Sequence, residues 1–387
     1  MNRKATLTFL GDIWCDATQT EAYRTDDGYD FDKAFEKISG RLKQSDYVVA
    51  NLETPVESGD FGGCPPPPDH YAPIEFAIAL KKVGVDLVST SNNHCLDKGI
   101  EGLVSTAKAL DKIGMSYIGT RIEENDSYLI KEINGIKIGF VSFTYGTNAF
   151  LNNCYLSPEQ FHMVDLLQNQ ELSNPFARWL YHSDNFLTKM CRKLNLFQMG
   201  EIVHERKERK SRHMAYLKQT IEKCKNAGAE IIIGCMHVGG QFYGAPMKYT
   251  TKICGKFVEM GIDIVIGNHE HVIHPYKTSV VNGKKKFVAY SLGDGFCDIG
   301  VLREPFDKNA DCSVMLTLTV TKDNKEVSFD GMDFSIIKLC RYDDDRENIQ
   351  IVLLDEEMQN PSISESRRDE LKAKYEKSIN AFVNLGM

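Results

Sequence analysis

The chain has 387 residues, of which 42% are hydrophobic and 26% are charged, which is the composition of an ordinary globular protein. This length allows one large domain or two ordinary ones, and the formal net charge of -8 argues against a general nucleic-acid binder. The 11 cysteines are odd in number and include no CxxC pair, which favours buried, reduced thiols in a cytoplasmic protein. The apolar run from Ala5 to Leu10 is too short for a signal peptide or a membrane span.

The first half of the chain alternates short apolar runs with segments of helical spacing, which predicts an α/β fold. The expected strands are 6–10, 46–50, 86–89 and a hairpin of 128–133 with 136–143 around Asn134-Gly135. The expected helices are 31–42, 74–83 and 100–113, the last closed by Gly114. Cys64 and the four prolines 65–68 can form neither a helix nor a central strand. We interpret them as a rigid loop near the functional site rather than as a ligand for a partner.

The pattern changes at about 158–212, where a Leu- and Phe-rich segment without strand signals predicts a helical insertion. It ends in a basic run consisting of His204, Arg206, Lys207, Arg209, Lys210, Arg212 and His213. Such a run is either a solvated helix face or a patch for an anionic polymer or a lipid headgroup.

Strands and helices alternate again after the insertion. The expected helices are 213–227, 247–260 and a charged amphipathic helix at 364–384. The expected strands are 230–234, 262–267, a hairpin within 278–291 around Asn282-Gly283, 314–321 and 326–334. We therefore divide the chain into one domain over 1–340, which carries the insertion, and a C-terminal extension over 341–387.

Six side chains that commonly bind metals each lie in a turn that follows a strand-like run. They are Asp12, Glu53, Asn93, His237, His269 and His271. Ligands of layered α/β folds gather beyond the carboxyl ends of the strands, so we expect these side chains to meet. Carboxylate, amide and imidazole together suit a hard or borderline divalent ion, and a shared carboxylate suits a pair of ions.

Two of these turns carry the most specific patterns. The turn at 91–99 places an amide, an imidazole and a carboxylate together as Asn93, His94 and Asp97, so the amide can bind metal and His94 can transfer a proton. The alternative is a helix-capping turn with an incidental histidine. His269 and His271 follow a buried strand and can serve two adjacent ions. His274 lies close behind and is either a substrate contact or a surface histidine.

In chain order the motifs read GD, NLE, NNHxxD, HxG and GxHxH, from Thr6 to about Phe296. This order resembles the poly-γ-glutamate capsule synthesis protein CapA family, a branch of the calcineurin-like metallophosphoesterases. The resemblance implies a four-layer α/β/β/α sandwich, with two central mixed sheets and a dinuclear metal site between them.

The resemblance also implies a role for each site residue. Asp12 and His271 would hold one ion, and Asn93, His237 and His269 would hold the other. Glu53 would bridge the two ions. His94 would protonate the leaving group, and Asp97 would support His94. The chain departs from the wider pattern at Trp14, where a histidine ligand is usual, and Asp16 is a nearby substitute for that ligand. It also departs at three later positions, where Gln241 replaces a Glu, Glu270 a Pro and Asp294 an Asn. These departures lie on the substrate side of the expected site.

Three functions remain open at this point. The favoured one is a cytoplasmic, metal-dependent phosphoesterase, a hydrolase that uses two Mn, Fe, Zn or Mg ions, because a shared carboxylate among three histidines is costly to bury without metal. The second is a non-catalytic accessory protein that binds an anionic polymer in capsule or poly-γ-glutamate synthesis or export, alongside capsule-synthesis partner proteins. The third is hydrolysis or transfer of an amide bond by the same two ions. None of the three needs a nucleic acid or a membrane span.

Overall fold

The computed structural model describes residues 3–15, 17–57, 71–170, 207–297, 310–324, 326–342 and 349–383, with the backbone alone for 17–18 and 207–211. Three regions singled out in the sequence lie outside these residues: Asp16, the proline loop around Cys64, and the part of the insertion and its basic run from 171 to 206.

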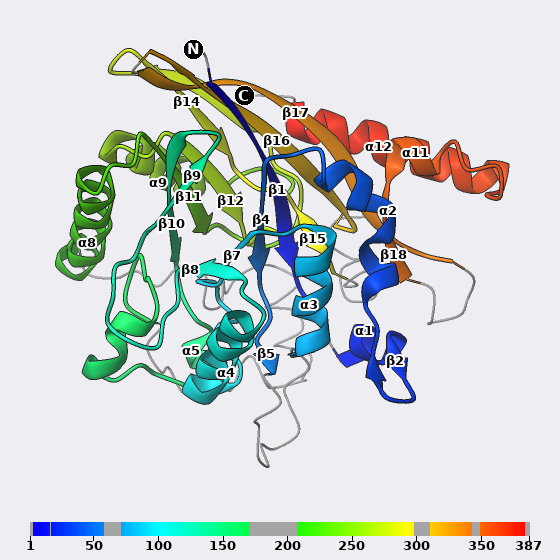
Figure 1. The fold of residues 1–387 in the computed structure, drawn as a ribbon, viewed down its shortest axis with the longest axis horizontal. Helices are drawn as coiled ribbons and strands as arrows, with labels where there is room; N and C mark the ends of the chain where they lie inside the picture. The colour runs from blue at the N-terminus through cyan, green and yellow to red at the C-terminus, as the bar shows by residue number, and fades with distance from the viewer. Residues whose placement is uncertain are drawn as a thin grey trace, which may run out of the picture.

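Two mixed β-sheets pack face to face in the centre of the molecule (Figure 1). The larger has the order β18-β17-β16-β1-β4-β7-β8, with β15 also paired to β1. Its strands are β1 (Arg3–Ile13), β4 (Tyr47–Leu52), β7 (Leu87–Ser89), β8 (Ser116–Ile118), β15 (Asp294–Phe296), β16 (Cys312–Asp323), β17 (Glu326–Arg341) and β18 (Ile349–Leu353). The strands β1, β4, β7 and β8 are parallel, so their carboxyl ends lie at one edge.

The smaller sheet has the order β13-β14-β12-β11-β10-β9, and its four inner strands are parallel. Its strands are β9 (Leu129–Ile133), β10 (Ile136–Thr144), β11 (Ile231–His237), β12 (Ile264–Asn268), β13 (Tyr276–Val281) and β14 (Lys284–Ala289). Antiparallel hairpins form both edges, and their Asn134-Gly135 and Asn282-Gly283 turns have positive φ at both positions, as a two-residue hairpin turn requires. Both predicted hairpins are confirmed.

Helices cover the outer face of each sheet, which gives four layers (Figure 1). The helices are α2 (Asp32–Leu42), α3 (Ile74–Val83) and α4 (Gly99–Lys112) on the larger sheet, and α8 (Lys207–Asn226) and α9 (Lys248–Met260) on the smaller. Alternation along the strands produces this arrangement, since successive side chains point to opposite faces. Leu7 faces the core between the sheets while Leu10 faces the helices, and Ile231 and Ile232 divide in the same way. The predicted α/β/β/α sandwich is confirmed.

The described part of the C-terminal extension belongs to the same packed unit. β18 pairs with β17, and α12 (Glu365–Val383) packs against the core between the sheets. Phe382 of α12 contacts Tyr276 of the smaller sheet, with ring centroids 5.2 Å apart, and Phe334 of the larger sheet at 5.0 Å. The shorter described elements are α1 (Ala17–Ala22), β2 (Arg24–Thr25), β3 (Gly28–Tyr29), β5 (Val56–Glu57), β6 (Ala72–Pro73), α5 (Ala149–Asn152), the 3₁₀ helix Pro158–Met163 and α11 (Leu354–Glu357).

The start of the expected helical insertion differs from the prediction. After the 3₁₀ helix, residues 164–170 form no helix but run between the ends of β8 and β10. The backbone N–H groups of Asp165 and Leu167 donate to Gly119 and Thr144, so hydrogen bonds to both sheets replace those of a helix. His213, counted in the basic run, contacts this segment at the carbonyl oxygen of Leu166, 3.1 Å from its Nδ1. Among the described helices, none is long and apolar enough to cross a membrane.

Candidate metal centre

The six side chains predicted as metal ligands are buried together at the carboxyl ends of parallel strands. Asp12 lies near the end of β1, Glu53 directly follows β4, and His237 is the last residue of β11. Asn93 lies in the turn after β7, and the two remaining histidines follow β12. The site therefore lies where both sheets end, as expected for a layered α/β fold.

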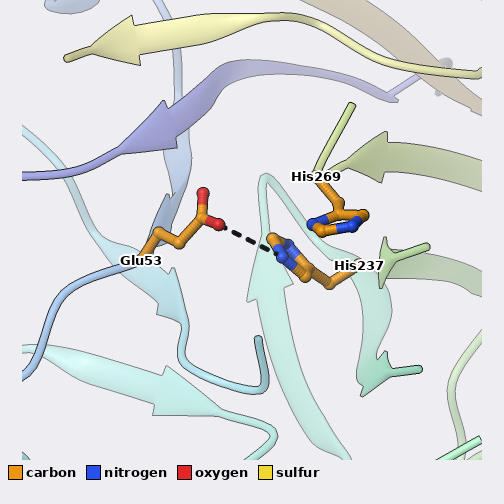
Figure 2. A group of neighbouring side chains, drawn as sticks. All are labelled: Glu53, His237 and His269. Atoms are coloured by element: carbon orange, nitrogen blue, oxygen red, sulfur yellow. Dashed lines mark ion pairs between the residues drawn. The ribbon is translucent and has the colours of Figure 1, made fainter. Parts of the chain in front are cut away.

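Glu53 is surrounded by imidazole rings. Figure 2 shows Glu53, His237 and His269 converging from three different strand ends. Glu53 Oε1 lies 3.3 Å from His237 Nε2, 3.8 Å from His271 Nε2 and 4.0 Å from His94 Nε2. A single carboxylate oxygen therefore faces three histidines.

Asp12 lies in a second group with His271 and Asp294, whose candidate ligand atoms are within 4.8 Å of one another. Its Oδ1 accepts a hydrogen bond from Asn51 Nδ2 at 2.6 Å, and its Oδ2 accepts one from the backbone N–H of His269 at 2.9 Å. His271 Nδ1 is 3.5 Å from Asp12 Oδ2. Asp294 was not predicted as a ligand, although it has the same signal as the others: an acid soon after a buried strand.

Burial shifts the pKa values of the site toward uncharged side chains. Burial, followed by the charge of Glu53, raises the pKa of Asp12 well above its usual value. Burial lowers the pKa of His237 to about 4 and that of His269 well below its usual value. Both imidazoles are therefore neutral near pH 7, the form that binds metal. Neither ring nitrogen of His269 has a hydrogen-bond partner among the described residues. A buried imidazole in this state fits a metal ligand.

Asn93 completes the group around His237. Its Oδ1 lies 2.6 Å from His237 Nε2, and its Nδ2 donates to Asn148 Oδ1 at 3.4 Å. Asn148 has a φ of 49°, a left-handed conformation that asparagine tolerates better than most residues. The amide oxygen of Asn93 accepts a hydrogen bond from His237 Nε2 in the metal-free site, so the two candidate ligand atoms are adjacent.

His94 and Asp97 form a buried pair next to the ligand groups. His94 Nδ1 lies 2.6 Å from Asp97 Oδ2, and Asn152 Nδ2 donates to Asp97 Oδ1 at 2.7 Å. Burial lowers the pKa of His94, but the charge and hydrogen bond of Asp97 outweigh it, so the net pKa is raised. The Trp14 ring stacks on His94, with centroids 5.1 Å apart. These contacts point His94 Nε2 toward Glu53.

The residues that depart from the family pattern lie around His271. Gln241 Nε2 is 3.3 Å from His271 Nε2, and the Phe242 ring stacks on the His271 ring with centroids 5.4 Å apart. Glu270 is buried and points away from the ligands: its Oε2 accepts from the Gly240 N–H at 2.8 Å and its Oε1 from Thr250 Oγ1 at 3.0 Å. Glu270 thus holds the loop that carries Gln241 and Phe242.

His274 is fully buried, so its interpretation as a surface histidine is wrong. Its Nε2 donates to the carbonyl oxygen of Tyr243 at 2.7 Å, a second contact that holds the same loop. Nothing in the local sequence distinguishes this packing from exposure, because the contact depends on the path of a loop 31 residues away.

The fold and the site define a four-layer α/β sandwich protein with two buried groups of acids and histidines whose ligand atoms are close enough to hold metal ions. The family model "Bacterial capsule synthesis protein PGA_cap" matches residues 6–298, and the chain belongs to this family. It is 24% identical over 307 residues to the capsule biosynthesis protein CapA of Bacillus anthracis, covering 78% of this chain and 62% of that protein. It is 22% identical over 282 residues to the PGA biosynthesis protein CapA of Bacillus subtilis (strain 168), covering 70% and 58%.

The matched region therefore spans about three fifths of the length of these two relatives. Among solved structures, the calcineurin-like phosphoesterase YfkN from Bacillus subtilis matches 97% of this chain and 99% of its own, at 14% identity and a TM-score of 0.43. A likeness of this size does not establish a shared activity.

Proposed function

We propose that this protein is a hydrolase that cleaves phosphoesters with the help of two divalent metal ions. One observation carries the proposal: Glu53 Oε1 faces three imidazoles beside a second buried group that contains Asp12 and His271. Buried carboxylates next to neutral histidines are unfavourable unless cations compensate their charge. The preferred ions are Mn, Fe, Zn or Mg, since all four accept oxygen and imidazole ligands.

The proposed ligands fall into two sets. Asp12 and His271 would hold one ion, Asn93, His237 and His269 would hold the other, and Glu53 would contribute to both. When bound, such a pair of ions neutralises charge on phosphoryl oxygens and lowers the pKa of a water molecule.

His94 is the proposed general acid. Its raised pKa favours retention of a proton near neutral pH, and its Nε2 faces the space next to Glu53. From there it can donate a proton to the departing alkoxide oxygen. Asp97 accepts from Nδ1 and holds the ring, and Asn152 holds Asp97 in turn. Trp14 covers the ring of His94 and restricts the access of water to it.

The test combines metal content with turnover. The protein is loaded with Mn²⁺, its ions are counted by elemental mass spectrometry, and a panel of phosphomonoesters and phosphodiesters is assayed. We expect about two ions per chain, fewer in His237→Gln, and a wild-type count in His162→Gln, whose ring contacts the Ile122 carbonyl oxygen instead. Two bound ions without turnover on any phosphoester would contradict the proposal. Product analysis on a γ-glutamyl peptide would then test the amide alternative.

A second proposal concerns the process that the protein serves. The names of the two relatives place those proteins in capsule or PGA biosynthesis. We propose that this chain acts in the cytoplasm on, or binds, an anionic capsule polymer such as poly-γ-glutamate. Reversing the charges of Arg206, Lys207, Arg209 and Lys210 tests the accessory role: unchanged polyglutamate binding would count against it.

A further inference from the structure

Asp294 is held rigidly beside the proposed ligands. The short strand β15 runs parallel to β1, with Asp294 opposite Asp12. The Asp12 N–H donates to the Gly293 carbonyl oxygen at 3.0 Å, and the two chains approach so closely that a Cβ on Gly11 would lie 1.9 Å from that oxygen. The backbone that carries Asp294 is therefore held in place by its pairing with β1.

The Asp294 carboxylate contacts the Nδ1 atom of the His271 ring. Asp294 Oδ1 is 2.8 Å from His271 Nδ1, a hydrogen-bond distance, whereas Asp12 Oδ2 is 3.5 Å from the same nitrogen. A carboxylate without a proton only accepts, and the amide nitrogen of Gln241, which only donates, lies 3.3 Å from His271 Nε2. Both contacts place the ring proton on Nδ1. In the neutral ring Nε2 then carries the lone pair, and Nε2 lies 3.8 Å from Glu53 Oε1.

We propose that Asp294 is a positioning residue that fixes the Nδ1–H tautomer of His271 and thereby makes Nε2 the metal-binding atom. The proposal rests on the proposed metal centre. A carboxylate in this place also increases the basicity of the ligand nitrogen, which strengthens metal binding. It further holds His271 in its left-handed backbone conformation, with a φ of 59°, which costs energy unless the surroundings fix it.

A direct role for Asp294 as a ligand would have a different consequence. The atoms of Asp12, His271 and Asp294 are close enough to surround one ion. In that arrangement Nδ1 would bind the ion and would carry no proton. The location of the proton on His271 therefore separates the two roles.

The experiment compares wild type with Asp294→Asn, which keeps an acceptor oxygen but removes the charge, and Asp294→Ala, which removes both. Asp165→Asn is the matched control, because Asp165 is equally buried but is paired with Arg121. Long-range proton–nitrogen NMR spectra of labelled histidine report the tautomer in metal-free protein, and His271→Gln identifies the signal. Competition with a chelator reports the affinity for each ion.

We expect the Nδ1–H tautomer in wild type and in Asp294→Asn, and its loss in Asp294→Ala. The alanine variant should bind one of the two ions about 10- to 100-fold more weakly and leave the other unchanged, with a smaller loss in the asparagine variant. An Nε2–H tautomer in wild type, or a wild-type tautomer in Asp294→Ala, would overturn the proposal. Metal binding through Nδ1 in the loaded protein would do the same and make Asp294 a ligand. If wild type binds no ions, the proposed metal centre is contradicted. The tautomer of His271 in wild type and in Asp294→Ala still shows whether Asp294 orients this ring.

Discussion

Replacing Glu53 by glutamine should stabilise the metal-free protein and remove most of the stabilisation that divalent ions provide. Glu53 is fully buried, and its charge is the second largest cause of the raised pKa of Asp12. Without ions, the two carboxylates repel each other in a medium of low polarity. A neutral amide at position 53 removes this repulsion and stabilises the folded state. With ions, the same change removes the proposed shared ligand.

The expected size of the stabilisation by ions follows from the binding equilibrium and the chain length. An ion present at a hundred times its Kd adds ~2.7 kcal/mol, hence about 5 kcal/mol for two. An unfolding entropy of ~2.1 cal/mol/K per residue gives ~0.8 kcal/mol/K for 387 residues. The metal-free variant should melt above wild type, because the repulsion between two buried acids is relieved. Ions should raise the Tm of wild type by about 6 °C.

Thermal melts of chelated and Mn²⁺-loaded protein measure both effects. Glu357→Gln is the matched control, because Glu357 is also buried but lies 3.1 Å from Lys37 Nζ. That control should lower the Tm of the metal-free protein and keep the full shift with ions. The reasoning is refuted if Glu53→Gln melts below wild type without ions, or if it gains the full shift with them.

Three further predictions concern proton transfer, pH and packing. His94→Gln should lower kcat by about 10²- to 10⁴-fold for alkyl phosphoesters, and Asp97→Asn should lower it less. Neither variant should have much effect on a nitrophenyl ester, because its leaving group needs no proton. Equal losses on both substrates would argue against an acid role. Because burial lowers the pKa of His237 from 6.5 to about 4, this group contributes stability above pH 6.5 that is lost as the pH falls toward 4, by up to ~3 kcal/mol in metal-free protein. Denaturant melts should show this loss in wild type and less of it in His237→Gln, and parallel pH profiles would contradict the assignment. Gly11→Ala should lower the free energy of unfolding by at least ~1–3 kcal/mol, because the new Cβ would lie 1.9 Å from a backbone oxygen. In the same melts Gly40→Ala in α2, where nothing lies within 4 Å of the new Cβ, should be neutral or stabilising.

Much of the fold could be predicted from local patterns. Period-two and helical spacing located most of the long elements, and α3 begins and ends where predicted, at Ile74 and Val83. The Asn-Gly pairs located both hairpins, because only a tight turn with positive φ suits them. The six predicted ligands meet because each follows a strand and parallel strands end at the same edge, a consequence of topology that holds before any side-chain contact is known.

The sequence by itself thus determined the layered α/β architecture and the residue types that gather at its strand ends. Tertiary structure decided which neighbours each of them contacts. Asp294 enters the site through the register of β15 against β1, and His274 is buried by a loop far away in the chain. The extended path of 164–170 is likewise fixed by hydrogen bonds to two different sheets. Such contacts join residues distant in sequence, so no local periodicity encodes them, and only the folded chain brings their partners within hydrogen-bond distance.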